Sequence, residues 1–155
     1  MKTKIFAGAA SVALLLSAVA PATAHGDGER FPESKYRHDV MEHFKYAINN
    51  LVANAKGDVN HKDQIPALAN IMAQAATMTK ASFQKDTRGI HGMTEAKDAI
   101  WENWEDFAGR LDQLEADTKA FAEVANSTDN MGEIMGAFKN VGRHCKSCHD
   151  KYKED

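Results

Sequence analysis

Side chains that favour burial recur between residues 94 and 125 at alternating intervals of four and three. The stripe consists of Ile100, Trp104, Phe107, Leu111, Leu114, Thr118, Phe121 and Ala125. This heptad spacing places all of them on one face of an α-helix and is typical of helices that pack in a left-handed bundle. No stretch of the remaining chain alternates with a period of two for long enough to indicate a β-strand. The sequence therefore predicts an all-α domain.

Three further blocks show the same helical periodicity. They span residues 33–55, 63–83 and 130–153. Gly57 is suited to a C-cap of the first block, Asp63 to an N-cap of the second, and Pro66 to the first turn that follows. We expect a loop over 84–93 and a third helix that opens at Thr94. Four long helices with short connections predict an antiparallel four-helix bundle.

The N-terminal segment has the features of an export signal. Two lysines precede an apolar run from Ile5 to Val19, and a small-residue pattern follows at 22–24. The run is too short for a transmembrane helix of about 20 residues, and the cleavage pattern directly after it argues against an uncleaved anchor. We therefore expect a cleaved signal peptide over 1–24 and one mature domain over 25–155, located in the periplasm of a Gram-negative bacterium.

The charge and the cysteine content exclude several classes of protein. The chain has 22 acidic and 19 basic residues, and such a balance offers no basic footprint for nucleic acid or for an anionic membrane surface. The chain has only two cysteines, which sit three residues apart, and this is no disulfide framework for an exported fold. We expect neither a nucleic-acid partner nor a membrane partner.

Cys145, Cys148 and His149 form a C-x-x-C-H motif near the C-terminus, the attachment pattern of c-type haem. Residues at i, i+3 and i+4 share one helix face. Both thiols can therefore reach the vinyl groups along one edge of a porphyrin, and the histidine can donate a ring nitrogen to the iron. The motif predicts one covalent haem c per chain, with His149 as axial ligand.

Other uses of the same motif are less compatible with its surroundings. A thioredoxin-like C-x-x-C normally follows a strand in an alternating α/β pattern. A structural zinc site usually needs two more clustered ligands, and only His144 is adjacent. A disulfide across two intervening helical residues is geometrically awkward.

The first helix offers a residue for the opposite face of the iron. Met41 lies one turn after Arg37, so both point in the same direction. A thioether is a soft iron ligand, and a histidine–methionine pair raises the haem potential. Met41 can equally be a core residue, because methionine fills irregular gaps well. The sequence leaves both interpretations open.

The mature chain resembles cytochrome c′, the bundle-type family of c-type cytochromes. The resemblance rests on Tyr36-Arg37 and Met41 in the first helix, Thr94-Glu95-Ala96-Lys97 followed by Ile100-Trp101, and Cys145-Lys146-Ser147-Cys148-His149 with Tyr152. It implies covalent haem at Cys145 and Cys148, His149 as proximal ligand, and a homodimer. It also implies that Arg37 lies near a haem propionate, with His38, Thr94 and Glu95 lining the same edge.

Each of these four pocket residues also has an interpretation that does not involve haem. Arg37 can be one more solvated charge, His38 a surface histidine, and Thr94 with Glu95 only a helix start. Two positions depart from the common family pattern. Members with an open iron usually carry Leu, Phe or Tyr in place of Met41, whereas a low-spin branch uses methionine as sixth ligand. Lys153 stands where many members have arginine, beside the proximal imidazole.

The resemblance implies a binding or redox role. A distal pocket of Met41, Phe44 and Phe83 would suit nitric oxide and carbon monoxide, which bind ferrous haem without a hydrogen bond, and would favour nitric oxide buffering. If Met41 ligates the iron, the protein is an electron carrier with an unidentified redox partner. We do not expect an enzyme, because a peroxidase needs a distal base and a charge-stabilising partner, and only Arg37 and His38 are candidates.

Overall fold

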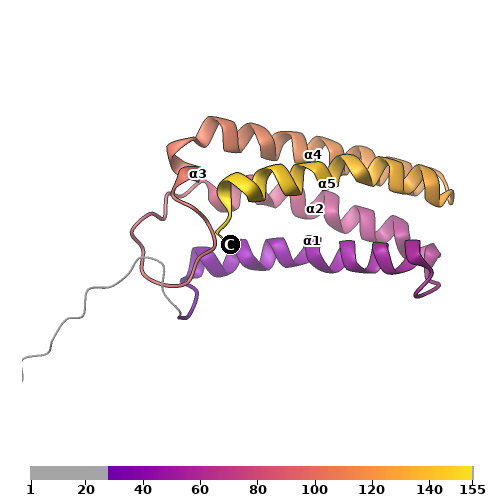
Figure 1. The fold of residues 1–155 in the computed structure, drawn as a ribbon, viewed down its shortest axis with the longest axis horizontal. Coiled ribbons are helices and arrows are strands. Elements are labelled where there is room, and N and C mark those ends of the chain that lie inside the picture. Colours follow the sequence, from indigo (N-terminus) through magenta and orange to yellow (C-terminus); the bar gives the residue numbers. More distant parts are fainter. Residues whose placement is uncertain (1–27, 155) are drawn as a thin grey trace, which may run out of the picture.

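The computed structural model describes residues 28–154, so the predicted signal peptide at 1–24 lies outside the described residues. The long helices are α1 (Pro32–Lys56), α2 (Ile65–Phe83), α4 (Trp104–Ser127) and α5 (Met131–Tyr152), with a short 3₁₀ helix η1 (Lys62–Gln64) before α2 and a short helix α3 (Ala99–Glu102) before α4. The long helices run side by side in alternating directions (Figure 1). The prediction of an antiparallel four-helix bundle is confirmed. Over the described residues, no helix is both long and apolar enough to cross a membrane.

The helices pack in the order α1, α2, α4, α5, because α2 and α4 each contact two long neighbours. Their shared interior is apolar and includes Leu51, Ile65, Met72, Phe121, Ile134 and Val141, none of which is more than 2% exposed. Near one end of the bundle, the ring of Phe107 lies 5.0 Å from those of both Phe83 and Tyr152 in edge-to-face contacts. Aromatic pairs in this geometry add to the stabilisation from burial alone. The heptad stripe of α4 is the centre of this core.

The boundaries of the first two helices follow their local signals. Gly57 ends α1 in the left-handed conformation with φ 81°, and its N–H bonds the carbonyls of Ala53 and Asn54. Pro66 lies in the first turn of α2, as predicted. The prediction that Asp63 caps α2 is wrong. Asp63 lies inside η1, and the N–H of Ile65 already bonds the carbonyl of Lys62, so the incoming 3₁₀ turn satisfies a donor that a side-chain cap would otherwise serve.

The prediction of one continuous third helix from Thr94 is also wrong. Residues 94–98 are outside any helix, and Ala96 forms an isolated antiparallel bridge with Lys153. Two backbone hydrogen bonds hold this bridge: Lys97 N to Tyr152 O at 3.0 Å and Glu154 N to Glu95 O at 2.8 Å. Because the partners lie at the far end of the chain, this tertiary contact overrides the local helix signal. A break at Asn103 then separates α3 from α4.

The start of α5 is set by Asn130. Its side-chain oxygen accepts hydrogen bonds from the backbone N–H groups of Gly132 (2.9 Å) and Glu133 (3.4 Å). Such a cap satisfies donors that have no partner inside the helix. Two neighbouring hydroxyl residues do not serve as this cap, because Ser127 is still part of α4 and Thr128 instead accepts from the Asn130 N–H.

Replacing Asn130 with Ala should lower the free energy of unfolding by about 1 kcal/mol, because two helix N–H groups lose their acceptor. The measurement is urea unfolding of the holoprotein followed by circular dichroism. Ser127→Ala is the control, since the Ser127 hydroxyl bonds only the Val124 carbonyl at the end of α4. An Asn130 variant no less stable than this control would show that the cap does not matter.

Candidate functional site

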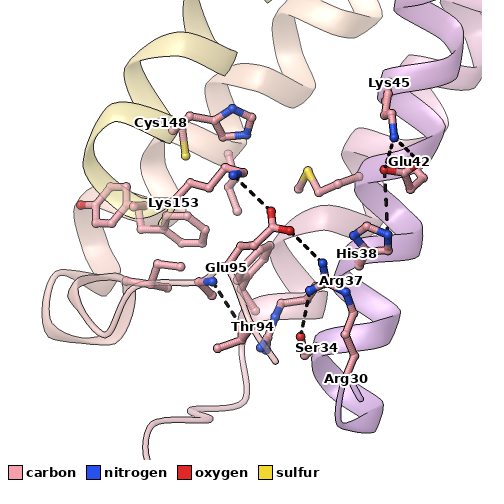
Figure 2. Close-up of a pocket in the computed structure, with 18 residues that line it drawn as sticks. Arg30, Ser34, Arg37, His38, Glu42, Lys45, Thr94, Glu95, Cys148 and Lys153 are labelled. Carbon is pink, nitrogen blue, oxygen red and sulfur yellow. Dashed lines mark hydrogen bonds and ion pairs between the residues drawn. The ribbon is translucent and has the colours of Figure 1, made fainter. Parts of the chain in front are cut away.

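A cavity of about 520 Å³ lies between α1 and α5, closed at one end by the 94–100 segment. Pockets of about 300–1,000 Å³ are typical of cofactor and small-molecule sites. Its lining residues are Arg30, Ser34, Arg37, His38, Met41, Glu42, Lys45, Phe83, Thr94, Glu95, Ala96, Ile100, Phe107, Leu111, Cys148, His149, Tyr152 and Lys153. Figure 2 shows the α1 residues on one wall and Cys148 and Lys153 on the other. The cavity therefore separates the first helix from the last.

The C-x-x-C-H motif occupies the last two turns of α5. Cys148 and His149 line the cavity, whereas Cys145 is half-buried one turn earlier. Burial raises the pKa of the Cys145 thiol and raises the pKa of Cys148 to about 11. Desolvation by the cavity wall, assisted by the charge of Lys153, lowers the pKa of His149. At neutral pH, His149 is therefore the uncharged imidazole that can donate a lone pair to a metal.

The alternatives for this motif receive no support from the described residues. Cys145 and Cys148 are not joined in a disulfide. Within residues 28–154, no three His, Cys, Asp or Glu side chains are grouped to hold a metal ion such as zinc. His144 instead pairs with Asp117 of α4 at 2.6 Å. The motif lies in a helix rather than after a strand.

Met41 of α1 lies on the opposite wall from His149. It is half-buried, lines the cavity and also packs against the core. The other apolar residues that line the cavity are Phe83 of α2, Ile100 of α3, and Phe107 and Leu111 of α4. Phe44, which we expected in this pocket, is buried in the core and does not line it. On helix α1, Phe44 lies three residues after Met41 and belongs to the core-facing stripe with Val40 and Ala47.

Arg37 is the most unusual side chain of the site. It is only 3% exposed, and its guanidinium lies 5.2 Å from the ring of Phe83 and 5.6 Å from that of Trp101. Nη2 donates a hydrogen bond of 3.1 Å to Thr87 Oγ1. Nη1 is buried, and over residues 28–154 it has no hydrogen-bond partner. The reading of Arg37 as a solvated surface charge is wrong.

The unpaired Nη1 is informative about what the cavity accepts. A buried donor without a partner is costly, and a buried cation more so. Burial lowers the pKa of Arg37, yet a guanidinium stays charged in proteins. A carboxylate at this end of the cavity would satisfy both the charge and the free donor. Haem carries two propionates, so the donor set of the site fits this cofactor.

A polar rim borders the apolar part of the cavity. On α1, His38 lies 3.9 Å from Glu42, and Glu42 accepts a hydrogen bond from Lys45 at 2.9 Å. His38 is half-exposed and lines the cavity. His38 is therefore both a partly exposed surface histidine and a residue at the edge of the pocket. Together these residues leave the cavity open to charged groups at its edge and apolar inside.

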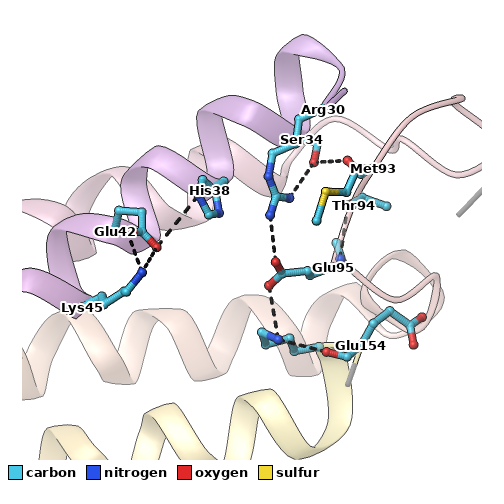
Figure 3. A network of polar contacts seen from close by, with 11 residues as sticks. Arg30, Ser34, His38, Glu42, Lys45, Met93, Thr94, Glu95 and Glu154 are labelled. Carbon is cyan, nitrogen blue, oxygen red and sulfur yellow. Dashed lines mark hydrogen bonds and ion pairs between the residues drawn. The ribbon is translucent and has the colours of Figure 1, made fainter. Parts of the chain in front are cut away.

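Thr94 and Glu95 line the cavity from the loop before α3. Glu95 accepts from Arg30 at 2.8 Å and pairs with Lys153 at 3.2 Å, as Figure 3 shows. The hydrogen bond from Arg30 is the main reason that the pKa of Glu95 is lowered. Thr94 Oγ1 accepts from the Ala96 N–H at 3.2 Å in a non-helical turn. The reading of this pair as a helix start is wrong.

Three polar residues of the site escaped the sequence analysis. Thr87 holds Arg37, Arg30 pairs with Glu95, and Ser34 donates to the Met93 carbonyl at 2.7 Å. Thr87 is buried within a loop. A buried polar residue in a loop shows no periodic pattern in the sequence. Thr87 could have been suggested only by the need of a buried Arg37 for a hydrogen-bond partner.

Beside the cavity, Tyr152 links the buried wall to the surface. Its hydroxyl donates to Asp106 Oδ2 at 2.5 Å, and Asp106 also accepts from Arg110 at 2.8 Å and Lys151 at 3.0 Å. The hydrogen bond from Arg110, followed by those from Tyr152 and Lys151, holds the pKa of Asp106 well below its usual range. This cluster ties the start of α4 to the last turn of α5.

Known proteins share these features over most of the chain. A family model described as Cytochrome C′ matches residues 33–153. Cytochrome c-554 of Cereibacter sphaeroides is 30% identical over 121 residues, which cover 76% of this chain and 90% of that protein. Cytochrome c′ of Rubrivivax gelatinosus is 32% identical over 125 residues, which cover 75% of this chain and 95% of that protein.

The same likeness holds for the fold. The crystal structure of cytochrome c′ from Thermochromatium tepidum matches with a TM-score of 0.72 at 28% identity, over 79% of this chain and 95% of that chain. The match therefore covers most of the chain and not a single motif alone.

The Asp106 cluster predicts a defined pH dependence of stability. A carboxyl whose pKa is lowered in the folded state contributes stability that is complete above its unfolded value of about 3.9 and is lost as the pH falls. The loss of unfolding free energy caused by Asp106→Asn should therefore shrink below about pH 5. Urea titrations of wild type and variant at several pH values measure this difference.

Tyr152→Phe is the matched variant, because it removes one hydrogen-bond donor and leaves the carboxylate in place. It should show a smaller loss with the same direction of pH dependence. A difference between wild type and Asp106→Asn that stays constant down to about pH 2 would contradict the lowered pKa, because the usual Asp value is about 3.9.

Proposed function

The chain belongs to the cytochrome c′ family, whose model spans residues 33–153, and from this premise we propose that it is a periplasmic monohaem c-type cytochrome that binds small gases such as nitric oxide and carries electrons. Proteins of this family carry covalently bound haem c. The observation that supports the proposal is the cavity between α1 and α5, with His149 on the α5 wall, Met41 on the α1 wall and apolar lining residues from α2, α3 and α4. The haem would supply the redox centre and the iron site for a gas.

Three residues of α5 would hold the cofactor. Cys145 and Cys148 would form the two thioether bonds, and His149 would donate its uncharged imidazole to the iron. The helical spacing that places Cys148 and His149 on the cavity supports these roles. Tyr152 would keep the last turn in place through its hydrogen bond to Asp106.

The opposite wall would select the ligand. Arg37 would bind a propionate through its free Nη1, with His38, Thr94 and Glu95 along the same edge. Besides Met41, the apolar lining of the cavity comes from Phe83, Ile100, Phe107 and Leu111 of the other helices. Nitric oxide and carbon monoxide need no hydrogen-bond donor, whereas dioxygen gains from one. The apolar lining therefore favours the first two gases.

A second candidate function follows from Met41. Because its thioether side chain lines the cavity on the wall that faces His149, it is placed to serve as sixth ligand. Histidine–methionine ligation raises the haem potential and would make the protein chiefly an electron carrier. Both functions need an unidentified redox partner, and neither turns over a substrate. The guanidinium of Arg37 is engaged by Thr87 and aromatic rings, so it is poorly placed to assist peroxide cleavage.

The location and the assembly complete the proposal. Export through the signal peptide at 1–24 would deliver the protein to the periplasm, where covalent attachment retains the haem. Tyr46 and Ile71 are 60% and 42% exposed on a groove formed by α1 and α2. Such exposed apolar side chains support a homodimer.

Optical and electron paramagnetic resonance spectra of the purified protein, with and without nitric oxide, test the ligation. We expect a high-spin ferric spectrum and prompt binding of nitric oxide in the ferrous state, because the interior lining of the cavity from α2, α3 and α4 is apolar. Met41→Leu should then leave the ferric spectrum unchanged. A low-spin spectrum with a sulfur-to-iron charge-transfer band that Met41→Leu abolishes would favour the electron carrier instead.

The combined replacement Cys145→Ala and Cys148→Ala should abolish covalent haem and reduce the yield of folded protein several-fold. The physical reason is that a cavity of about 520 Å³ without its occupant removes packing from the core. Denaturing gel electrophoresis with haem staining measures attachment, and circular dichroism measures folding. Ser147→Ala lies between the two cysteines and serves as control. Haem that remains covalently bound in the double variant would refute the attachment roles.

A further inference from the structure

Glu95 bridges two cations across one end of the cavity. Its Oε1 accepts from Arg30 at 2.8 Å, and its Oε2 lies 3.2 Å from Lys153 Nζ. In Figure 2, Glu95 lies between the Arg30 side and the Lys153 side of the cavity. The Arg30 side chain is only 15% exposed, against 41% for Lys153. The Arg30 pair is therefore the better shielded of the two from solvent.

The two cations belong to opposite walls. Arg30 precedes α1 by two residues, and α1 carries Met41. Lys153 follows α5 directly, and its backbone N–H bonds the carbonyl of His149 at 3.1 Å. The ion-pair chain from Arg30 through Glu95 to Lys153 thus connects the helix of the candidate sixth ligand with the helix of the candidate axial ligand.

Backbone contacts make Glu95 a firm point for this connection. The segment around it is bonded to both ends of the chain by Glu154 N to Glu95 O (2.8 Å), Lys97 N to Tyr152 O (3.0 Å), Ser34 Oγ to Met93 O (2.7 Å) and Met93 N to Glu29 O (3.3 Å). If α1 moves away from α5 at this end, the segment must lose its contacts on one side. These are the bonds of Met93 and the Arg30 pair on the α1 side, or the bonds of Glu95 and Lys97 and the Lys153 pair on the α5 side.

Removal of the Glu95 carboxylate would change the separation of the two walls in a defined direction. Without the negative charge of Glu95, Arg30 and Lys153 would remain as two like charges on opposite sides of the cavity. Like charges at such short range repel one another. The repulsion would push the α1 side and the α5 side apart at this end, and the cavity would open more often.

We propose that Glu95 is a positioning residue that holds α1 and α5 together at the end of the cavity and thereby limits the entry of small gases to the iron. It acts through Arg30 and Lys153 on the separation of the two walls and does not touch the gas. The inference rests on the proposed function, because it assumes a gas-binding haem between these walls.

The test compares ferrous wild-type holoprotein with Glu95→Gln, using carbon monoxide as the probe. Flash photolysis gives the association rate, and amide hydrogen exchange gives the opening of the 95–97 contact at Lys97 and Glu154. We expect the association rate to rise by up to about fivefold, the range that partly exposed ion pairs support. Exchange at both amides should rise with it. Lys153→Gln, which breaks one of the two pairs, should give a smaller rise in both quantities.

Glu33→Gln is the matched control. Glu33 forms an ion pair with Lys85, which ties the 84–98 loop to α1 away from the cavity lining. This variant also removes one carboxylate and one ion pair, but it leaves the connection between Arg30 and Lys153 intact, and it should change neither quantity. An equal rise in Glu33→Gln, or unchanged rates in Glu95→Gln, would overturn the proposal.

The two proposals can fail separately. If ferrous wild type binds no carbon monoxide, the gas-binding function is wrong, while hydrogen exchange still reports whether Glu95 closes the 95–97 contact. If wild type binds the gas and Glu95→Gln binds it at the same rate, the function stands and the positioning role of Glu95 is refuted.

Discussion

The site depends on which helices pack against the first and the last helix. α1 packs on α2 and α5 packs on α4, so the two helices that border the cavity are each held from behind by the apolar core. The hydrophobic effect supplies most of this stabilisation and has no directional demand. A bundle of this kind can therefore keep two helices apart and present one wall with His149 to another with Met41. A cofactor bound between them would fill the cavity and pack against the apolar core.

Charged groups at the cavity divide into two kinds. Arg37 is a buried cation held by Thr87 and aromatic rings, with one donor still free. An uncompensated charge in the interior is costly, and an anionic group in the cavity would reduce that cost. The rim residues, by contrast, satisfy one another: Glu42 with Lys45, and Glu95 with Arg30 and Lys153. We propose that the first kind binds the cofactor and that the second connects the walls of the cavity.

Much of the fold was predictable, because helical periodicity reports burial directly. The ends of α1 and α2 followed from Gly57 and Pro66, whose backbone preferences are local. The errors occurred where partners distant in sequence competed with local preference. Thr94 and Glu95 suggested a helix start, but Ala96 pairs with Lys153 at the other end of the chain. Phe44 was expected in the pocket, yet its place on the core-facing stripe of α1 directs it into the bundle.

By itself, the sequence determined the helical class of the fold, the attachment motif and the candidate residue Met41, since spacing along a helix decides which side chains share a face. Only the tertiary structure decided which of these faces meet. It placed Met41 and His149 on opposite walls, enclosed Arg37 among Phe31, Phe83 and Trp101, and brought Arg30, Glu95 and Lys153 together. The physical reason is that these contacts join residues that are tens of positions apart. Their geometry comes from the packing of whole helices, which no local preference encodes.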